Sequence, residues 1–143
     1  MGFQPVSPTL ISLRSPMPPN FTIQVTHEFC AAHSIILNAT PEPIHGHNFQ
    51  TTATVIGSHL DDEGLLCDFH LLEQTLKDIC QPFTNNNLNN CPPFDTLNPT
   101  AENLAKHIAD QLASQLDSKI APAKVHSVSI TEAPNCLATY TRT

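Results

Sequence analysis

The sequence predicts an α+β domain in which a four-stranded antiparallel sheet carries two helices on one face. Three observations predict this class. Alternating apolar residues occur towards both ends of the domain, two stretches with helical spacing lie between them, and Pro- or Asn-rich segments separate these runs. Of the 143 residues, 40% are hydrophobic, which is enough for one core. We therefore expect a single domain at residues 21–143.

The first twenty residues differ in composition from the rest. They contain five prolines and no hydrophobic periodicity, so residues 1–20 are interpreted as a Pro-rich tail outside the core. Alternation begins at Phe21 and continues in phase to His33, which predicts the first strand. A second alternating run, rich in β-branched residues, occupies residues 47–56. The two prolines in residues 38–43 indicate a loop between the strands.

Two helices are predicted in the middle of the chain. Asp68 and Thr100 each stand where an N-cap residue is expected. After each cap, apolar residues recur at spacings of three and four, as they do on one face of a helix. These residues are Phe69, Leu72, Leu76 and Ile79 in the first helix, and Leu104, Ile108, Leu112 and Leu116 in the second. Alternation returns in residues 125–131 and 136–141, which predicts the last two strands.

Composition excludes several classes of function. Six Lys and Arg residues against 13 Asp and Glu give a net charge of -7, which argues against a nucleic-acid partner bound through a basic face. No apolar run is long enough to span a membrane, and the start does not resemble a signal peptide. The five cysteines form no CxxC pair and are typical of reduced thiols. We expect a cytoplasmic protein with neither a nucleic-acid nor a membrane partner.

The tripeptide at residues 45–47, His-Gly-His, predicts a metal site. Residues i and i+2 of a strand point to the same face, so His45 and His47 can meet one ion. His33 is the candidate third ligand, since it ends the first strand in phase with Phe29 and Ala31. Three neutral imidazoles suit Zn²⁺ and leave its fourth position open. The alternative is that the pattern arises by chance in a chain with eight histidines.

Two carboxylates are candidates for the chemistry around such a site. Glu42 lies three residues before His45, where it could move a proton, although it could also be a solvated loop residue. Glu132 ends a strand and could accept two parallel hydrogen bonds from the edge of a pterin or guanine, or could be a simple turn residue. Glu102 is assigned to the first turn of its helix, where it complements the dipole.

Several segments together resemble the 6-pyruvoyl-tetrahydropterin synthase / 6-carboxytetrahydropterin synthase family. The matching segments are FCAAH at 29–33, HGHNF at 45–49, LDDEGLLCDF at 60–69, NPTAENLA at 98–105 and ITE at 130–132. They occur in the order and spacing of the family, and the resemblance covers residues 21–141. The Pro-rich tail lies outside it.

The resemblance implies a tunnelling (T-) fold, in which the sheets of several subunits join around a central channel as a barrel. It implies a homo-hexamer built as a dimer of trimers. The family's zinc ligands fall on His33, His45 and His47, and its pterin-anchoring glutamate falls on Glu132. The implied substrate is 7,8-dihydroneopterin triphosphate, a reduced pterin triphosphate.

Two departures from the family pattern bear on the reaction. Most members have a catalytic cysteine four residues before the first histidine of H-G-H, where this chain has Pro41. Glu42 instead produces the E-x-x-H-G-H variant of the family, which is associated with the product 6-hydroxymethyl-7,8-dihydropterin. A carboxylate is already ionised at neutral pH and needs no activating partner. Thr84 and Asn85 occupy the place of the family's Asp-His pair.

The sequence thus predicts a zinc-dependent lyase that acts on the side chain of 7,8-dihydroneopterin triphosphate and gives 6-hydroxymethyl-7,8-dihydropterin. Glu42 is the expected base and Glu132 the expected anchor of the pterin ring. One alternative is a 6-carboxytetrahydropterin synthase of the queuosine route. Another is a catalytically silent paralogue that binds zinc and a pterin, which the Thr84 and Asn85 replacements favour. A third is a metal-free structural relative.

Overall fold

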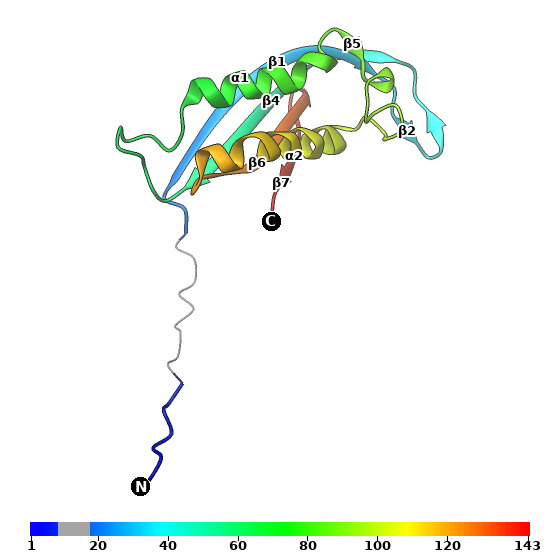
Figure 1. Ribbon diagram of the computed structural model, residues 1–143. Helices are drawn as coiled ribbons and strands as arrows, with labels where there is room; N and C mark the ends of the chain where they lie inside the picture. The colour runs from blue at the N-terminus through cyan, green and yellow to red at the C-terminus, as the bar shows by residue number, and fades with distance from the viewer. Residues whose placement is uncertain (9–17) are drawn as a thin grey trace.

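The computed structural model describes residues 1–8 and 18–143, and its core confirms the predicted α+β class (Figure 1). The main sheet orders its four long strands as β1-β4-β6-β7, with antiparallel neighbours. Two helices lie across one face of this sheet. The elements are β1 (Phe21–His33), β4 (His45–Gly57), α1 (Phe69–Cys80), α2 (Ala101–Ile120), β6 (Lys124–Ala133) and β7 (Cys136–Thr141).

The predicted tail is only partly described. Residues 1–8 and 18–20 are exposed and belong to neither helix nor strand. The remaining part of the predicted tail, residues 9–17, lies outside the described residues. The first strand begins where the sequence predicts, at Phe21.

The sheet has one more strand than predicted. A two-residue strand, β5 (Asn86–Asn87), pairs in parallel with β1 at Ala31 and Ala32, so the sheet has five strands. The prediction of four was wrong because two residues are too few to show any periodicity. β5 is flanked by two 3-10 turns, η1 (Gln81–Phe83) and η2 (Leu88–Asn90).

The segment between β1 and β4 is also more regular than predicted. A small hairpin of β2 (Ile36–Leu37) and β3 (Thr40–Pro41) replaces part of the expected loop at 38–43. Asn38 and Ala39 make its turn with positive φ values of 50° and 62°, as the tight turns of hairpins require. The prolines indicated a loop because Pro cannot donate to a ladder, but Pro41 lies at the end of this short edge strand, where that is tolerated.

The helices begin at the predicted caps. The Asp68 carboxylate accepts a hydrogen bond from His70 N at 2.8 Å, and the Thr100 hydroxyl accepts one from Asn103 N at 3.2 Å. The apolar stripes of both helices are buried with one exception. Phe69, predicted to lie on the buried face, is 51% exposed. It is the first residue of α1, between the exposed Asp68 and His70, so this end of the helix lies at the surface.

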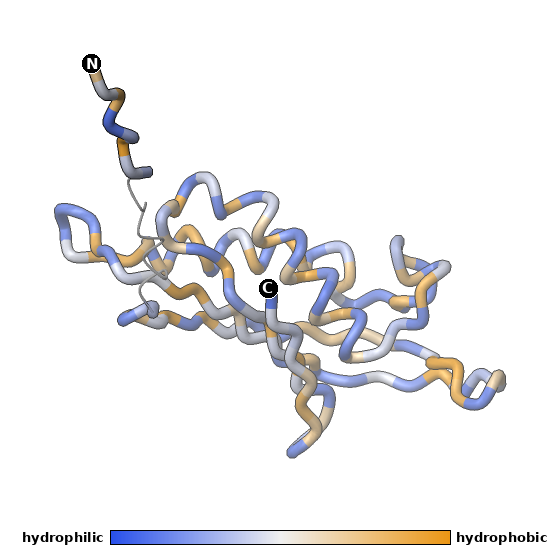
Figure 2. The backbone as a smooth tube through the Cα atoms, turned by 90° about the horizontal axis from the view of Figure 1, so that it is seen from below, coloured by the Kyte–Doolittle hydropathy of each residue, from blue (hydrophilic) through white to orange (hydrophobic). Residues whose placement is uncertain are grey.

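The two faces of the sheet have different chemistry, and apolar and polar residues alternate along its strands (Figure 2). The face under the helices is apolar, with the rings of Phe29 and Phe49 stacked at a centroid distance of 5.5 Å. The uncovered face carries side-chain hydrogen bonds between neighbouring strands. They join Gln24 to Thr54 (3.0 Å), Thr26 to Thr52 (3.1 Å) and Ser129 to Thr139 (2.7 Å). This face is therefore polar without being strongly charged.

Leu104 tests the packing of α2. Its side chain is fully buried against the sheet, so Leu104→Ala is expected to lower the free energy of unfolding by about 2–5 kcal/mol through lost burial and a residual cavity. Urea denaturation of both proteins measures the difference. The matched control is Leu60→Ala at a 41% exposed position, where we expect a change within about 0.5 kcal/mol. Equal effects at the two positions would contradict this packing.

Within the described ranges, no helix combines the length and apolar character needed to cross a bilayer.

Candidate metal centre

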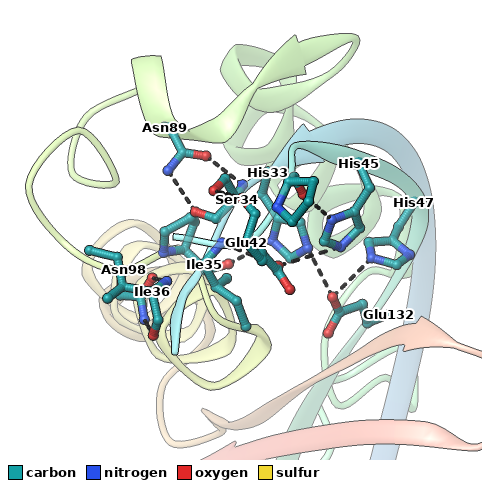
Figure 3. A network of polar contacts seen from close by, with 12 residues as sticks. His33, Ser34, Ile35, Ile36, Glu42, His45, His47, Asn89, Asn98 and Glu132 are labelled. Carbon is teal, nitrogen blue, oxygen red and sulfur yellow. Dashed lines mark hydrogen bonds and ion pairs between the residues drawn. The ribbon is translucent and has the colours of Figure 1, made fainter. Parts of the chain in front are cut away.

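Three histidines converge at one end of the sheet, on the face that the helices cover (Figure 3). The β1–β4 register places His33 opposite His45 and Ala31 opposite His47. Because side chains alternate along a strand, all three imidazoles point to the same face. Their ring centroids lie 4.7–5.1 Å apart, and His33 is fully buried. The predicted convergence of His33, His45 and His47 is therefore present.

Backbone carbonyl groups fix two of these rings. His33 Nδ1 donates a hydrogen bond to the Pro99 carbonyl at 2.8 Å, and His45 Nδ1 donates one to the Pro43 carbonyl at 2.9 Å. A carbonyl oxygen can only accept, so both Nδ1 atoms carry the proton. In the neutral ring, the lone pair then lies on Nε2, which faces the centre of the cluster. Metal-binding histidines are commonly oriented in this way.

Glu132 supplies a fourth group to the cluster. Its Oε1 lies 2.9 Å from His33 Nε2 and 3.0 Å from His47 Nε2, and the four candidate ligand atoms lie within 4.8 Å of one another. Both nitrogens are buried, and among the described residues neither has a hydrogen-bond partner. A nitrogen lone pair facing a carboxylate oxygen needs a cation between the two. The donor set therefore fits a divalent metal ion with nitrogen and oxygen ligands, such as zinc.

The protonation state of His47 suits this role. Burial lowers the pKa of His47 below its ordinary value, while the nearby Glu132 carboxylate acts in the opposite direction. The net shift keeps the ring neutral at pH 7, which is the form that binds a metal.

Glu42 lies at the rim of the histidine cluster. Its Oε1 is 3.6 Å from His45 Nε2 and accepts a hydrogen bond from Ile35 N at 3.2 Å. Glu42 N donates in turn to the Ile35 carbonyl at 3.0 Å. The carboxylate is 24% exposed, so it can reach a bound molecule beside the cluster. The structure thus brings both predicted carboxylates to the predicted histidines.

Two cavities have His47 in their lining. One, of about 430 Å³, is lined by Cys30, Asn48 and Asn85 among others. The other, of about 470 Å³, is lined by residues that include Glu28, Gln50, Thr131 and Glu132. Cavities of this size accommodate a small heterocyclic ligand. Cys30 Sγ donates to Asn48 Oδ1 at 2.9 Å, which fixes the thiol at the first of these cavities.

Sequence reasoning missed two features of the carboxylates. Glu132 contacts the imidazoles, and the signal for this was its strand phase, since it lies two residues after the buried Ile130. Glu102, assigned to the helix dipole, lines a small cavity of about 200 Å³ together with Glu132. No sequence signal connects these two residues, because they meet only when α2 packs beside β6.

Two other histidines, His70 and His107, have different surroundings. His70 is exposed and bonds to Asp68 at 3.1 Å. The ring of His107 packs edge-on against Phe83 and Phe94, and burial lowers its pKa. Among the described residues, neither belongs to the metal-ligating cluster.

Comparisons with known proteins identify a family and a fold. The family model described as 6-pyruvoyl tetrahydropterin synthase matches residues 22–143. A protein of Archaeoglobus fulgidus, provisionally named a 6-carboxy-5,6,7,8-tetrahydropterin synthase, is 29% identical over 93 residues, which is 65% of this chain and 76% of that protein.

Solved structures give the same fold. The 6-pyruvoyl tetrahydropterin synthase of Caenorhabditis elegans has a TM-score of 0.75 and 23% identity, and covers 89% of this chain and 98% of its own. A Plasmodium vivax 6-pyruvoyltetrahydropterin synthase has a TM-score of 0.67 and 18% identity, covering 86% and 99%. The latter is described as a catalytic-residue mutant in which alanine replaces a glutamate. These likenesses confirm the predicted T-fold at the level of the single subunit.

Proposed function

The chain belongs to the 6-pyruvoyl tetrahydropterin synthase family, and we propose that it is a zinc-dependent lyase that cleaves the side chain of 7,8-dihydroneopterin triphosphate. One observation carries this proposal. Three imidazoles and the Glu132 carboxylate form one candidate metal site, and the Glu42 carboxylate lies at its rim. This combination provides a place for the ion and a proton acceptor beside it.

The residues have separate roles in the proposed reaction. His33, His45 and His47 would hold the zinc ion, and the ion would polarise the side-chain hydroxyl oxygens of the substrate. Glu42 accepts a proton from the substrate side chain, and as a carboxylate it needs no prior deprotonation, unlike a thiol. Glu132 borders both the cluster and the adjoining cavity, where it holds the pterin ring.

The first candidate product is 6-carboxy-5,6,7,8-tetrahydropterin. The name of the Archaeoglobus fulgidus relative supports it, since that protein is named for this product. The second candidate is 6-hydroxymethyl-7,8-dihydropterin, which the sequence predicts. The position of Glu42 at the cluster favours it, as does the glutamate described as catalytic in the Plasmodium vivax protein. Both products require cleavage of a carbon–carbon bond in the side chain.

Mass spectrometry of the product tests the proposal. Zinc-loaded protein is incubated with 7,8-dihydroneopterin triphosphate, and the expected result is a 6-carboxy pterin. A 6-hydroxymethyl product would select the second candidate. A 6-pyruvoyl product, in which the carbon skeleton is intact, would contradict cleavage. Zinc-bound protein that binds a pterin without turnover would instead be the silent paralogue.

The role of Glu132 has its own test. Glu132→Gln is expected to raise the KM for the pterin about 10-fold or more, because a neutral amide cannot replace a charge-assisted hydrogen bond of about 1.5–3 kcal/mol. Steady-state kinetics and the zinc content are measured together, with Glu63→Gln in an exposed turn as the control. If Glu132→Gln loses its zinc but has an unchanged KM once zinc is added back, Glu132 is a metal ligand rather than the pterin anchor.

The proposed assembly is a homo-hexamer. Two features support association: β7 has an open outer edge, and β5 pairs with only two residues of β1 within the described sheet. Open strand edges favour pairing with another chain. Three exposed apolar side chains near the metal site, Ile36, Leu37 and Ile44, would also be covered by a neighbour. Light scattering after size exclusion is expected to give six chains' mass, and a stable monomer would contradict the assembly.

A further inference from the structure

Two asparagine side chains pair with the backbone of the segment that joins β1 to the β2–β3 hairpin (Figure 3). Asn89 Oδ1 accepts a hydrogen bond from Ser34 N at 2.8 Å, and Asn89 Nδ2 donates one to the Ser34 carbonyl at 2.8 Å. Asn98 pairs with Ile36 in the same way, at 2.8 Å and 3.1 Å. Each amide therefore takes the place of a neighbouring strand for one residue.

This pairing needs the chemistry of an amide. A side-chain amide offers one acceptor and two donor hydrogens from the same planar group, so it can satisfy the N–H and the C=O of one residue together. An aspartate of the same shape has acceptors only. It would leave the backbone carbonyl facing a carboxylate oxygen, and a buried or half-buried unpaired acceptor is costly.

The clamped segment holds Glu42. The Ser34 hydroxyl donates to the Glu42 carbonyl at 2.6 Å. Ile35, which lies between the two clamped residues, contacts Glu42 twice: its N–H donates to Oε1 and its carbonyl accepts from Glu42 N. The orientation of the Glu42 carboxylate therefore depends on a backbone that Asn89 and Asn98 fix from both sides.

The two asparagines are themselves fixed. The Asn98 carbonyl accepts hydrogen bonds from Thr100 N at 2.8 Å and from Asn103 Nδ2 at 2.9 Å, at the start of α2. The next residue, Pro99, is the one whose carbonyl orients His33. Asn89 lies in η2, and its N–H donates to Asn87 Oδ1 at 3.0 Å. The loop at residues 98–99 thus supports both the candidate ligand His33 and the segment beside Glu42.

We infer that Asn89 and Asn98 are positioning residues that hold the Glu42 carboxylate at the histidine cluster. The inference rests on the proposed role of Glu42 as the base. It assigns no contact with the substrate to either asparagine. Each acts through the backbone of residues 34–36.

Kinetics provide the first test. Asn98→Asp and Asn89→Asp are each expected to lower kcat by roughly 100-fold, the effect of a base misplaced by about 1 Å, with little change in KM or zinc content. Asn90→Asp, an exposed neighbour on the same turn as Asn89, is the matched control. In a Glu42→Ala background, the same two variants should lower the residual kcat no further. Additive losses would overturn the inference, and so would a loss of zinc.

Amide exchange provides a test that needs no turnover. The Ile35 N–H reports the position of the carboxylate, because it donates to Glu42 Oε1. The Ile36 N–H reports the pairing with Asn98, because it donates to Asn98 Oδ1. In folded, zinc-loaded Asn98→Asp, both amides are expected to exchange faster by NMR. Faster exchange of the Ile36 N–H with an unchanged exchange rate of the Ile35 N–H would overturn the inference.

The two tests separate the inference from the proposed function. If the wild-type protein has no turnover but Asn98→Asp still makes the Ile35 and Ile36 N–H groups exchange faster, the lyase proposal is refuted. The inference that Asn98 positions the Glu42 carboxylate then still stands. Asn89→Asp acts from a different loop, so it supplies the same measurement through Ser34 if Asn98→Asp does not fold.

Discussion

Replacing Glu42 by alanine is expected to lower turnover by roughly 10²–10⁴-fold, which is the usual contribution of a general base. Zinc content and folding should be unchanged. The carboxylate lies at the rim of the cluster, 3.6 Å from the nearest histidine nitrogen, and its hydrogen bond to Ile35 is on a partly exposed loop. Product formation under saturating substrate measures the loss, and elemental analysis measures the zinc.

Glu42→Gln refines this prediction. The amide oxygen of glutamine can still accept a hydrogen bond from Ile35 N, but it cannot accept a proton from the substrate. It should therefore be nearly as inactive as Glu42→Ala while keeping the loop in place. Glu63→Ala, in an exposed turn, serves as the control. Wild-type turnover in Glu42→Gln would show that Glu42 holds the loop and that the base is elsewhere.

Replacing His33 by alanine is expected to remove the bound zinc and, with it, all turnover that depends on the ion. His33 is fully buried; its Nδ1 donates to the Pro99 carbonyl, and its Nε2 is one of the candidate ligand atoms beside Glu132. Its loss removes that ligand atom and leaves the Pro99 carbonyl without its partner, which costs about 1–3 kcal/mol. Zinc stoichiometry after purification in zinc-containing buffer is the measurement.

His107→Ala is the matched control for this loss. It removes a half-buried imidazole that packs against Phe83 and Phe94 and lies outside the cluster. It should lose stability but keep its zinc. Stoichiometric zinc in His33→Ala would mean that other residues hold the ion. If the wild-type protein bound no zinc, the alternative of a metal-free structural relative of the family would be supported.

The sequence predicts best those structural features that depend on a single hydrophobic periodicity. The apolar stripe of α2 required only a spacing of three and four, and all four predicted leucine and isoleucine positions are buried. The alignment of His33 with the His-Gly-His tripeptide required only the period of two along neighbouring strands. Phe69 is exposed, contrary to the prediction, because periodicity identifies a face of a helix and not which part of that face is covered.

Features that depend on register or long-range contacts could not be predicted in this way. The strand phase of Glu132 indicates its face of the sheet, but its contact with His33 and His47 depends on the register in which β6 pairs with β4, at Gln50 and Thr131. A one-residue slip would turn the carboxylate to the other face. The hydrogen bond between Ile36 N and Asn98 Oδ1 joins residues that are 62 positions apart in the chain. No local pattern marks the two-residue strand β5.

The uncovered face of the sheet has a consequence for the thermodynamics of assembly. Its Thr, Ser and Gln side chains are already bonded to one another across the strands. A barrel built with this face inward would enclose water rather than an apolar core. Subunits joined through strand edges would then bury little apolar area on that side, and that surface would add little to the negative heat-capacity change of association.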